Sequence, residues 1–532
     1  MKLKICLLTV LIALVLCPAC KGAGTEYLFR LVPEATDFTE ASGLDAYPIC
    51  QAEGVYVTDN FDLVRSLDRQ GALVYYEENG PVILQEYARD MKTLAGESWS
   101  RAILGADYAA ARGNEGDGAR VGMIDSGVSV KFEDYSDSVI VPGVNYCAPQ
   151  EPEEPKSETE TPEVEIRSAL QEELPSEREL WKEYIESESW KHGLSYDTMW
   201  TGRSDAWKAF AQERHDTADE VSHGTFAASI LFSQEVGLAP SAELVPLKCF
   251  TDKDNGSIDA ICEAIYDAVD VYHCDVINMS FGVKEDYETL KDAVTYAYDH
   301  GVILVASAGN LETGTHSTGN DPVLYPAAYE QVIAVGSLDR NKVLASHSSQ
   351  NGSIWVTAPG VAVRGLSMKT GSYISGYGTS YAAPFVSAAA ALSRSARADL
   401  SPKEFRVLLA KTAEDLGETG RDPAYGYGMM NLGLLLAAVA KDGESMIPSY
   451  YNGTLCLSLW LPQAENSLTW LARYETSGRF YSLEELSEMG MNNLPLTEEA
   501  PKLQVMRLDR DTAAPIGPAI RYGGGDLSET TE

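Results

Sequence analysis

Five short apolar runs alternate with helical segments, and this rhythm constrains the fold more than any other feature of the sequence. The runs are RVGMID, ELVPLKCF, DVINMSF, GVILVASAG and QVIAVGS. Each is apolar on consecutive positions, which is typical of strands buried on both faces. The segments between them, such as 257–272 and 286–300, have the apolar spacing of helices. The sequence therefore predicts an α/β fold in which helices flank a parallel sheet and ligands bind at the carboxyl ends of the strands.

The length of 532 residues and the hydrophobic fraction of 45% predict a large core divided among about three or four folding units. A net charge of −38 argues against nucleic acid and anionic membranes as partners, because neither finds the clustered cations that would neutralise its phosphates. The changes of composition predict five segments: a signal at 1–20, a small α+β unit at 26–95, a main domain at 99–440, an acidic insertion within it at 149–222, and a small C-terminal module at 443–532.

The first twenty residues have the pattern of an export signal. Lys2 and Lys4 precede an apolar run from Ile5 to Leu16, which small residues follow. The run is too short to span a bilayer, and no later segment is long enough, so we expect no transmembrane span in the mature chain. Simple secretion is the expected outcome. Lipid anchoring at the extracytoplasmic cell surface through Cys20 is the alternative.

The acidic insertion begins with the Pro- and Glu-rich stretch APQEPEEPKSETETPEVE, which predicts a solvated loop. A helix-prone part follows and carries four tryptophans, at positions 181, 190, 200 and 207. The simpler interpretation is a surface insertion. The alternative, that it forms a lid over a cleft or binds a partner, stays open. The six cysteines after position 20 have no metal-binding spacing and are expected to pack as small apolar residues.

Four polar residues follow or begin the predicted elements at points where a sheet of this type places its active site. Asp125 ends a strand, His223 and Ser380 each open a helix, and Asn310 follows another strand. A serine hydroxyl needs a base to take its proton and a carboxylate to orient that base. Acyl transfer also needs donors for the oxyanion, and the Asn310 amide and the Ser380 backbone N–H can supply them. This set predicts acyl transfer through a serine nucleophile.

In this order, the motifs MIDSGV, HGTFAA, NMSFG, ASAGN and GTSYAAP resemble those of the subtilisin-like serine peptidases, the subtilases. The resemblance covers about residues 106–431. It implies a three-layer α/β fold and an exported serine endopeptidase that acts on proteins or peptides through an acyl-enzyme. It also implies catalytic roles for Asp125, His223 and Ser380 and an oxyanion role for Asn310. The substrate-binding residues that it implies are Ser280, Phe281, Gly282, Ala308 and Gly309.

Some positions depart from the family pattern. Ser126 replaces a Thr after the aspartate, and Tyr381 replaces the Met often found after the nucleophile. The family's calcium-binding loop is shortened in SILFSQEVGLAP, so calcium is not expected there, while calcium elsewhere stays open. No cofactor is required and no metal ligand is predicted.

The unit at 26–95 stands where such peptidases carry an inhibitory prosegment. Its stretch GALVYYEENGPVILQ resembles the last strands of that unit. The resemblance therefore implies a zymogen that is inhibited by its own prosegment and cleaves itself between Glu86 and Ser98.

Two other interpretations compete with catalysis. Ser380 alone would be taken as a helix N-cap, with Pro384 in the first helical turn. The whole domain could also be a peptide-binding or regulatory pseudo-peptidase of the same fold. The intact set of Asp125, His223 and Ser380 argues against that second alternative.

Overall fold

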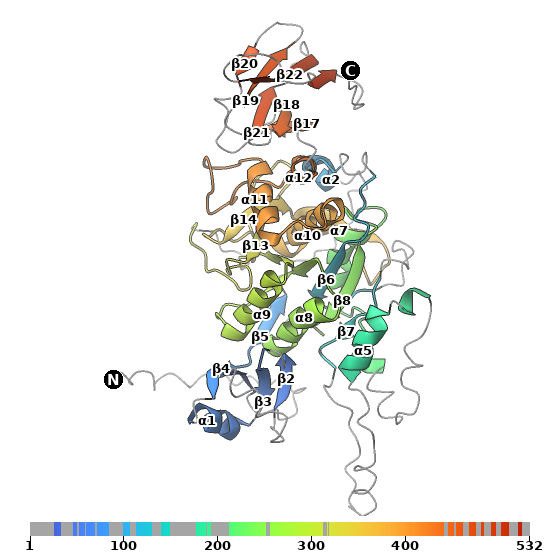
Figure 1. Cartoon of the computed structure of the whole chain (residues 1–532), viewed down its shortest axis with the longest axis vertical. Coiled ribbons are helices and arrows are strands. Elements are labelled where there is room, and N and C mark those ends of the chain that lie inside the picture. The colour runs from blue at the N-terminus through green and yellow to red at the C-terminus, as the bar shows by residue number, and fades with distance from the viewer. Residues whose placement is uncertain are drawn as a thin grey trace, which may run out of the picture. The chain divides into compact units, whose positions relative to one another are not determined.

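The computed structural model of the chain divides into two compact units, residues 1–79 and 80–532 (Figure 1). The described residues are 26–32, 46–50, 53–58, 60–69, 72–84, 99–106, 113–129, 140–148, 177–187, 189–192, 212–251, 256–311, 317 and 319–440, together with C-terminal strands between 445 and 523. The signal at 1–20, the cleavage region at 86–98 and the Pro/Glu-rich loop lie outside them. The unit boundary falls inside the segment 26–95, which the sequence treats as one unit.

In its described residues, the first unit has a four-stranded antiparallel sheet and one helix. The sheet order is β2-β3-β1-β4, and α1 (Phe61–Arg69) lies between β3 and β4 in the chain. Val64 and Leu67 of α1 pack against Phe29, Leu31 and Tyr56 of the sheet. This small core agrees with the α+β unit expected here. The strands are β1 (Tyr27–Leu31), β2 (Tyr47–Cys50), β3 (Val55–Thr58) and β4 (Leu73–Glu78).

The second unit is built around a seven-stranded sheet in which every neighbouring pair is parallel, which confirms the predicted fold class. The order is β14-β13-β12-β10-β6-β8-β7. Five strands coincide with the five apolar runs: β6 (Arg120–Asp125), β8 (Glu243–Lys248), β10 (Val276–Met279), β12 (Ile303–Ser307) and β13 (Val332–Leu338). The two edge strands, β7 (Val144–Asn145) and β14 (Ile354–Pro359), were not predicted from apolar runs, because the first has only two residues and the second mixes polar and apolar ones.

Helices cover both faces of this sheet (Figure 1). On one face α7 (His223–Phe232), α10 (Thr379–Ala396), α11 (Pro402–Thr412) and α12 (Leu432–Val439) share one large core with side chains of the strands. On the other face lie α8 (Ile258–Asp270) and α9 (Glu288–Asp299), with α8 against β6 and α9 against β12. A short helix, α2 (Trp99–Leu104), and the antiparallel pair β15 (Val361–Leu366) and β16 (Tyr373–Tyr377) complete this region.

Strand β5 (Pro81–Leu84) does not join the sheet of the first unit, although the sequence suggested that it was one of the last strands there. It lies instead between β11 (Phe281–Gly282) and β9 (Gly256–Ser257) and is antiparallel to both. Its Val82 is fully buried. The extended segment β5 therefore pairs with two short strands, of which β9 directly precedes α8 and β11 directly follows β10.

Part of the acidic insertion is packed into the protein. Helix α5 (Glu177–Glu186) buries Trp181, whose indole N–H donates to the Tyr272 hydroxyl at 2.8 Å and whose ring stacks on His215 at 3.5 Å between centroids. Trp181 is therefore a core residue, and a partner surface or lid that depends on this side chain is excluded. Trp190 lies in the following 3-10 helix η3 (Ser189–His192), and Trp200 and Trp207 are outside the described residues.

The described part of the C-terminal module is entirely of strands. They form two antiparallel sheets, with orders β17-β18-β21 and β20-β19-β22-β23. The strands are β17 (Ser445–Tyr451), β18 (Thr454–Trp460), β19 (Leu468–Tyr474), β20 (Phe480–Ser482), β21 (Met491–Pro495), β22 (Lys502–Asp509) and β23 (Ile520–Gly523). Within the described part of the whole chain, no helix is long and apolar enough to cross a membrane.

The packing of Trp181 predicts a large loss of stability on truncation. Trp181→Ala should lower the free energy of unfolding by about 3–5 kcal/mol, because it removes a fully buried aromatic side chain and its hydrogen bond. Urea unfolding measures the change. Trp190→Ala, at a partly exposed position, is the control and should cost clearly less. Equal small losses in both would contradict a structural role for α5.

Candidate active site

Asp125 is the last residue of β6, a strand inside the sheet. It is fully buried, and its Oδ1 accepts from the backbone N–H of Ser126 at 2.7 Å. The chain turns sharply after it at Gly127, which has a φ of 95°. A Cβ at Gly127 would lie 2.3 Å from the Thr217 carbonyl oxygen, so only glycine allows this turn beside the segment that precedes α7.

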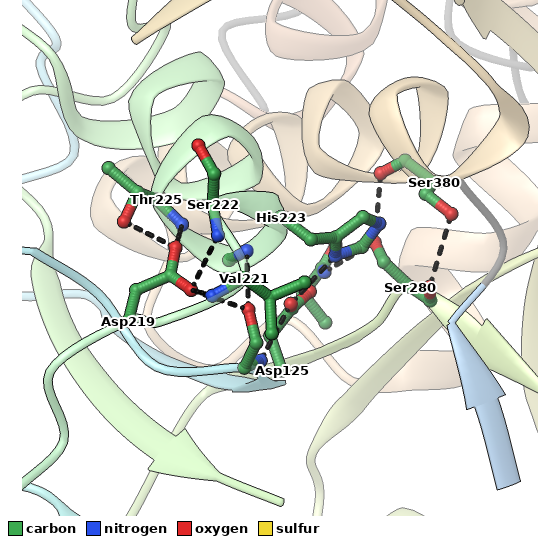
Figure 2. A network of polar contacts seen from close by, with 11 residues as sticks. Asp125, Asp219, Val221, Ser222, His223, Thr225, Ser280 and Ser380 are labelled. Atoms are coloured by element: carbon green, nitrogen blue, oxygen red, sulfur yellow. Dashed lines mark hydrogen bonds and ion pairs between the residues drawn. The ribbon is translucent and has the colours of Figure 1, made fainter. Parts of the chain in front are cut away.

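His223 is the first residue of α7, and its ring points toward Asp125 (Figure 2). Its Nδ1 lies 2.7 Å from Asp125 Oδ1, and both side chains are fully buried. The two elements approach closely because the next residue is Gly224, where a Cβ would lie 2.1 Å from the Gly127 carbonyl oxygen. The histidine and aspartate, 98 positions apart in sequence, thus form one buried hydrogen-bonded pair.

Ser380 is the second residue of α10, whose N-cap position is Gly378 with a φ of 144°. The expectation that Ser380 is itself the cap, with Pro384 in the first turn, is therefore wrong. Pro384 lies in the second turn, where it has no N–H to donate to the Ser380 carbonyl. Ser280 Oγ donates to this carbonyl instead at 2.9 Å, and Ser380 Oγ donates to the Ser280 carbonyl at 3.1 Å (Figure 2). The fully buried Ser280 and Ser380 are thus locked together.

Asn310 follows β12 and is oriented by the residue before Ser380. Its Oδ1 accepts from the backbone N–H of Thr379 at 3.0 Å and from the Thr379 hydroxyl at 3.1 Å. These two bonds turn the oxygen side of the amide toward the start of α10, so the Nδ2 side faces the other way. The same hydroxyl accepts from the N–H of Gly309 at 3.3 Å, which joins the Ala308-Gly309 turn to the start of α10.

The predicted substrate strand is occupied by another part of the chain. Phe281 and Gly282 form β11, and they pair with Leu84 and Ile83 of β5. Strand β9 pairs with β5 on its other side through Gly256 and Ser257. An extended peptide between two antiparallel neighbours is the arrangement of strand addition, in which backbone hydrogen bonds hold the peptide.

The structure brings the predicted residues together in pairs: Asp125 with His223, Ser280 with Ser380, and Asn310 with the start of α10. Tyr381, the residue after Ser380, packs against the start of α7: its ring centroid lies 5.5 Å from that of His223 and 4.2 Å from that of Phe226. Two residues that orient this set were missed from the sequence, Thr379 and Asp219. Thr379 stands inside the serine motif, and Asp219 precedes the histidine motif in ADEVSHGT, so their nearness to the motifs was the available signal.

The turn after α7 offers a poor donor set for calcium. Its Gly237 carbonyl accepts from the Arg101 guanidinium, and its Glu235 pairs with Arg364 at 2.5 Å. Calcium prefers several oxygen ligands that are not already engaged by cations. In the described part of the chain, no three His, Cys, Asp or Glu side chains gather as a metal site.

Comparisons with known proteins agree with this geometry. The pattern of the subtilase family matches residues 116–428. Subtilisin DY of Bacillus licheniformis is 37% identical over 229 residues, which are 42% of this chain and 81% of that protein. Subtilisin Savinase of Lederbergia lenta is 35% identical over 230 residues, which are 42% of this chain and 80% of that protein. The minor extracellular protease Epr of Bacillus subtilis is 33% identical over 217 residues, 40% of this chain but only 32% of Epr. The chain belongs to the subtilase family of serine-type endopeptidases.

Proposed function

We propose that Ser380, His223 and Asp125 act as a catalytic triad that hydrolyses peptide bonds in an exported endopeptidase. The observation that carries this proposal is the 2.7 Å contact between His223 Nδ1 and Asp125 Oδ1, in which both side chains are fully buried. A buried carboxylate beside Nδ1 keeps the proton on that nitrogen, so Nε2 is the basic nitrogen of the neutral ring. The same carboxylate stabilises the imidazolium that forms during the reaction.

The reaction follows from these roles. Ser380 Oγ attacks the carbonyl carbon of the substrate while its proton passes to His223 Nε2. The tetrahedral intermediate then collapses, the C–N bond breaks, and the leaving amine takes the proton from His223. Water hydrolyses the resulting ester of Ser380 by the same steps in reverse, with His223 again as the base. Protons and bonds balance without a cofactor.

The negative oxygen of the intermediate needs donors in place before it forms. The backbone N–H of Ser380 is at the N-terminus of α10, where the helix dipole favours negative charge. The Asn310 amide, held through its oxygen by Thr379, supplies the second donor through Nδ2. Because Thr379 orients the amide in advance, little reorganisation is needed during the reaction.

Substrates bind, in this proposal, where β5 lies. The pairing of β5 with β11 and β9 supports binding of an extended peptide by backbone hydrogen bonds. Strand β5 follows the first unit directly in the chain, and the residues after it contain the predicted cleavage region. The segment 26–95 therefore acts as an inhibitory prosegment whose end occupies the substrate site until it is cut.

Export is proposed from the signal pattern of residues 1–20. The relative Epr is named an extracellular protease.

Replacement of the nucleophile should abolish turnover. Ser380→Ala should lower kcat by roughly 10⁶-fold, because it removes the nucleophile. A serine-directed fluorophosphonate should label the wild type and not the variant. The variant should also lose only its signal, whereas the wild type should lose the prosegment as well. A folded wild type that is never labelled would instead support the pseudo-peptidase alternative.

Removal of the Asn310 amide should affect the chemical step more than binding. Asn310→Ala should lower kcat by about 10²–10³-fold with little change in KM, because the lost hydrogen bond forms only with the oxyanion. Steady-state kinetics on a peptide substrate measure both constants. An unchanged kcat would remove Asn310 from the oxyanion site.

The β5 segment should compete with substrate. A synthetic peptide of residues 79–86 should inhibit the mature enzyme competitively. The Val82→Asp version should bind at least about tenfold more weakly, because it places a charge where a fully buried apolar side chain lies. A scrambled peptide is the control. Non-competitive inhibition, or equal potency of all three peptides, would contradict the proposed position of the substrate.

A further inference from the structure

A second buried aspartate lies beside the triad and contacts none of its side chains. Asp219 is 5% exposed and precedes α7 by four residues. Figure 2 shows its carboxylate between the start of α7 and the segment that follows Asp125. Asp219 is not among the residues that the sequence motifs single out.

Five donors converge on this carboxylate. Its Oδ1 accepts from the Ser126 hydroxyl at 2.9 Å and from the backbone N–H groups of Val221 at 2.9 Å and Ser222 at 2.8 Å. Its Oδ2 accepts from the Thr225 backbone N–H at 2.9 Å and the Thr225 hydroxyl at 2.6 Å. Three of the donors are backbone N–H groups, which cannot accept, so the site matches a carboxylate that only accepts.

The charge is costly to bury and is stabilised by these contacts. Burial raises the pKa of Asp219, and the hydrogen bonds from Thr225, Ser222 and Ser126 act in the opposite direction. The position at a helix N-terminus favours a negative charge as well. A neutral residue of similar size would leave at least one of these backbone N–H donors without an acceptor.

The two carboxylate oxygens of Asp219 bind the two segments that carry Asp125 and His223. On one side, Ser126 is the residue next to Asp125, and its hydroxyl also accepts from the Gly224 N–H at 3.0 Å. On the other side, Thr225 is two residues after His223. The strand β6 that carries Asp125 and the helix that carries His223 are thus tied to one carboxylate.

This carboxylate also replaces the usual cap of α7. The N-cap residue Ser222 has a φ of 84° and makes no side-chain capping bond. The N–H groups of Gly224 and Thr225, in the first turn, are bound by Ser126 Oγ and Asp219 Oδ2 instead. The orientation of the start of α7 relative to the end of β6, and with it the place of the His223 ring, therefore depends on Asp219.

We propose that Asp219 is a positioning residue, which holds His223 and Asp125 at their catalytic spacing through Ser126 and Thr225. The inference rests on the proposed triad and extends it to a residue that touches neither substrate nor the reacting atoms.

Asp219→Asn tests the proposal. The amide keeps the size of the carboxylate but has one acceptor oxygen, and its NH₂ group must face backbone N–H groups in either orientation. The expected result is a fall in kcat of about 10- to 100-fold, because small misplacements of catalytic groups have effects of this size. KM should change less than twofold, since the substrate strands β9 and β11 are not touched.

The matched control is Asp422→Asn. Asp422 is also buried, and its carboxylate accepts from the backbone N–H groups of Glu418, Ala424 and Tyr425 at 3.0, 2.7 and 2.7 Å. It lies in a turn that carries none of the proposed catalytic residues. This variant should lose stability to urea much as Asp219→Asn does, but its kcat should stay within twofold of the wild type. The positioning role would be overturned if kcat fell to a similar extent in both variants, or if it fell in neither.

Ser126→Ala covers the case in which Asp219→Asn does not fold. It removes the bond between the Ser126 hydroxyl and Asp219 and leaves four donors on Asp219, so the protein should fold. Its kcat should fall at least threefold, and a wild-type kcat would overturn the proposal.

When both single variants fold, the double variant tests whether they act together. Its kcat should fall by less than the product of the two single effects, because both substitutions break the same hydrogen bond. Fluorophosphonate labelling of the wild type keeps a failure of this inference separate from a failure of the proposed triad.

Discussion

Burial of α10 against the parallel sheet is the constraint on which the site depends. Every residue from Thr379 to Ser393 is buried, and the alanines at 388–391 let the helix lie close to the strands. An apolar helix of this kind cannot shift without exposing the shared core with α7 and α12. Because Ser380 is the second residue of α10, its position is set by the packing of the whole helix.

Glycine and proline residues then allow the other polar groups of the site to lie near Ser380. Gly127 and Gly224 permit β6 and α7 to approach to a distance that any side chain would block. Pro384 removes one helical hydrogen bond, and Ser280 Oγ takes the place of the missing donor at the Ser380 carbonyl. Each of these residues has a structural role that also places a polar group of the site. The site is therefore assembled from ordinary rules of helix starts, glycine turns and proline.

In the proposed function, strand β5 connects this geometry to inhibition of the enzyme by its own chain. Its pairing with β11 beside Ser280 places the chain's own segment in the proposed substrate site. A peptidase that acts on extended chains can be blocked by a segment of the same shape, and the order of the sequence places that segment between the first unit and the main domain. The packed helix α5 shows, by contrast, that part of the acidic insertion belongs to the core.

Much of this was readable from the sequence. Runs of consecutive apolar residues indicated the parallel sheet, because a strand buried on both faces is apolar at every position and not only at alternate ones. The five motifs pointed to Asp125, His223, Asn310 and Ser380 as candidates, because each combines a reactive side chain with the end of an element. The edge strands β7 and β14 were missed, since short or mixed strands carry little pattern.

Only the tertiary structure decided what depends on contacts between distant segments. The pairing of β5 outside the sheet of the first unit, the burial of Trp181 and the bond from Ser126 to Asp219 come from segments that meet in space but share no pattern in sequence. The sequence by itself determined the sheet, the helices and the residue types of the site, because these follow from local periodicity and chemistry. The spacing of Asp125 and His223 was decided by packing, since they are 98 positions apart in sequence and no local rule spans that distance.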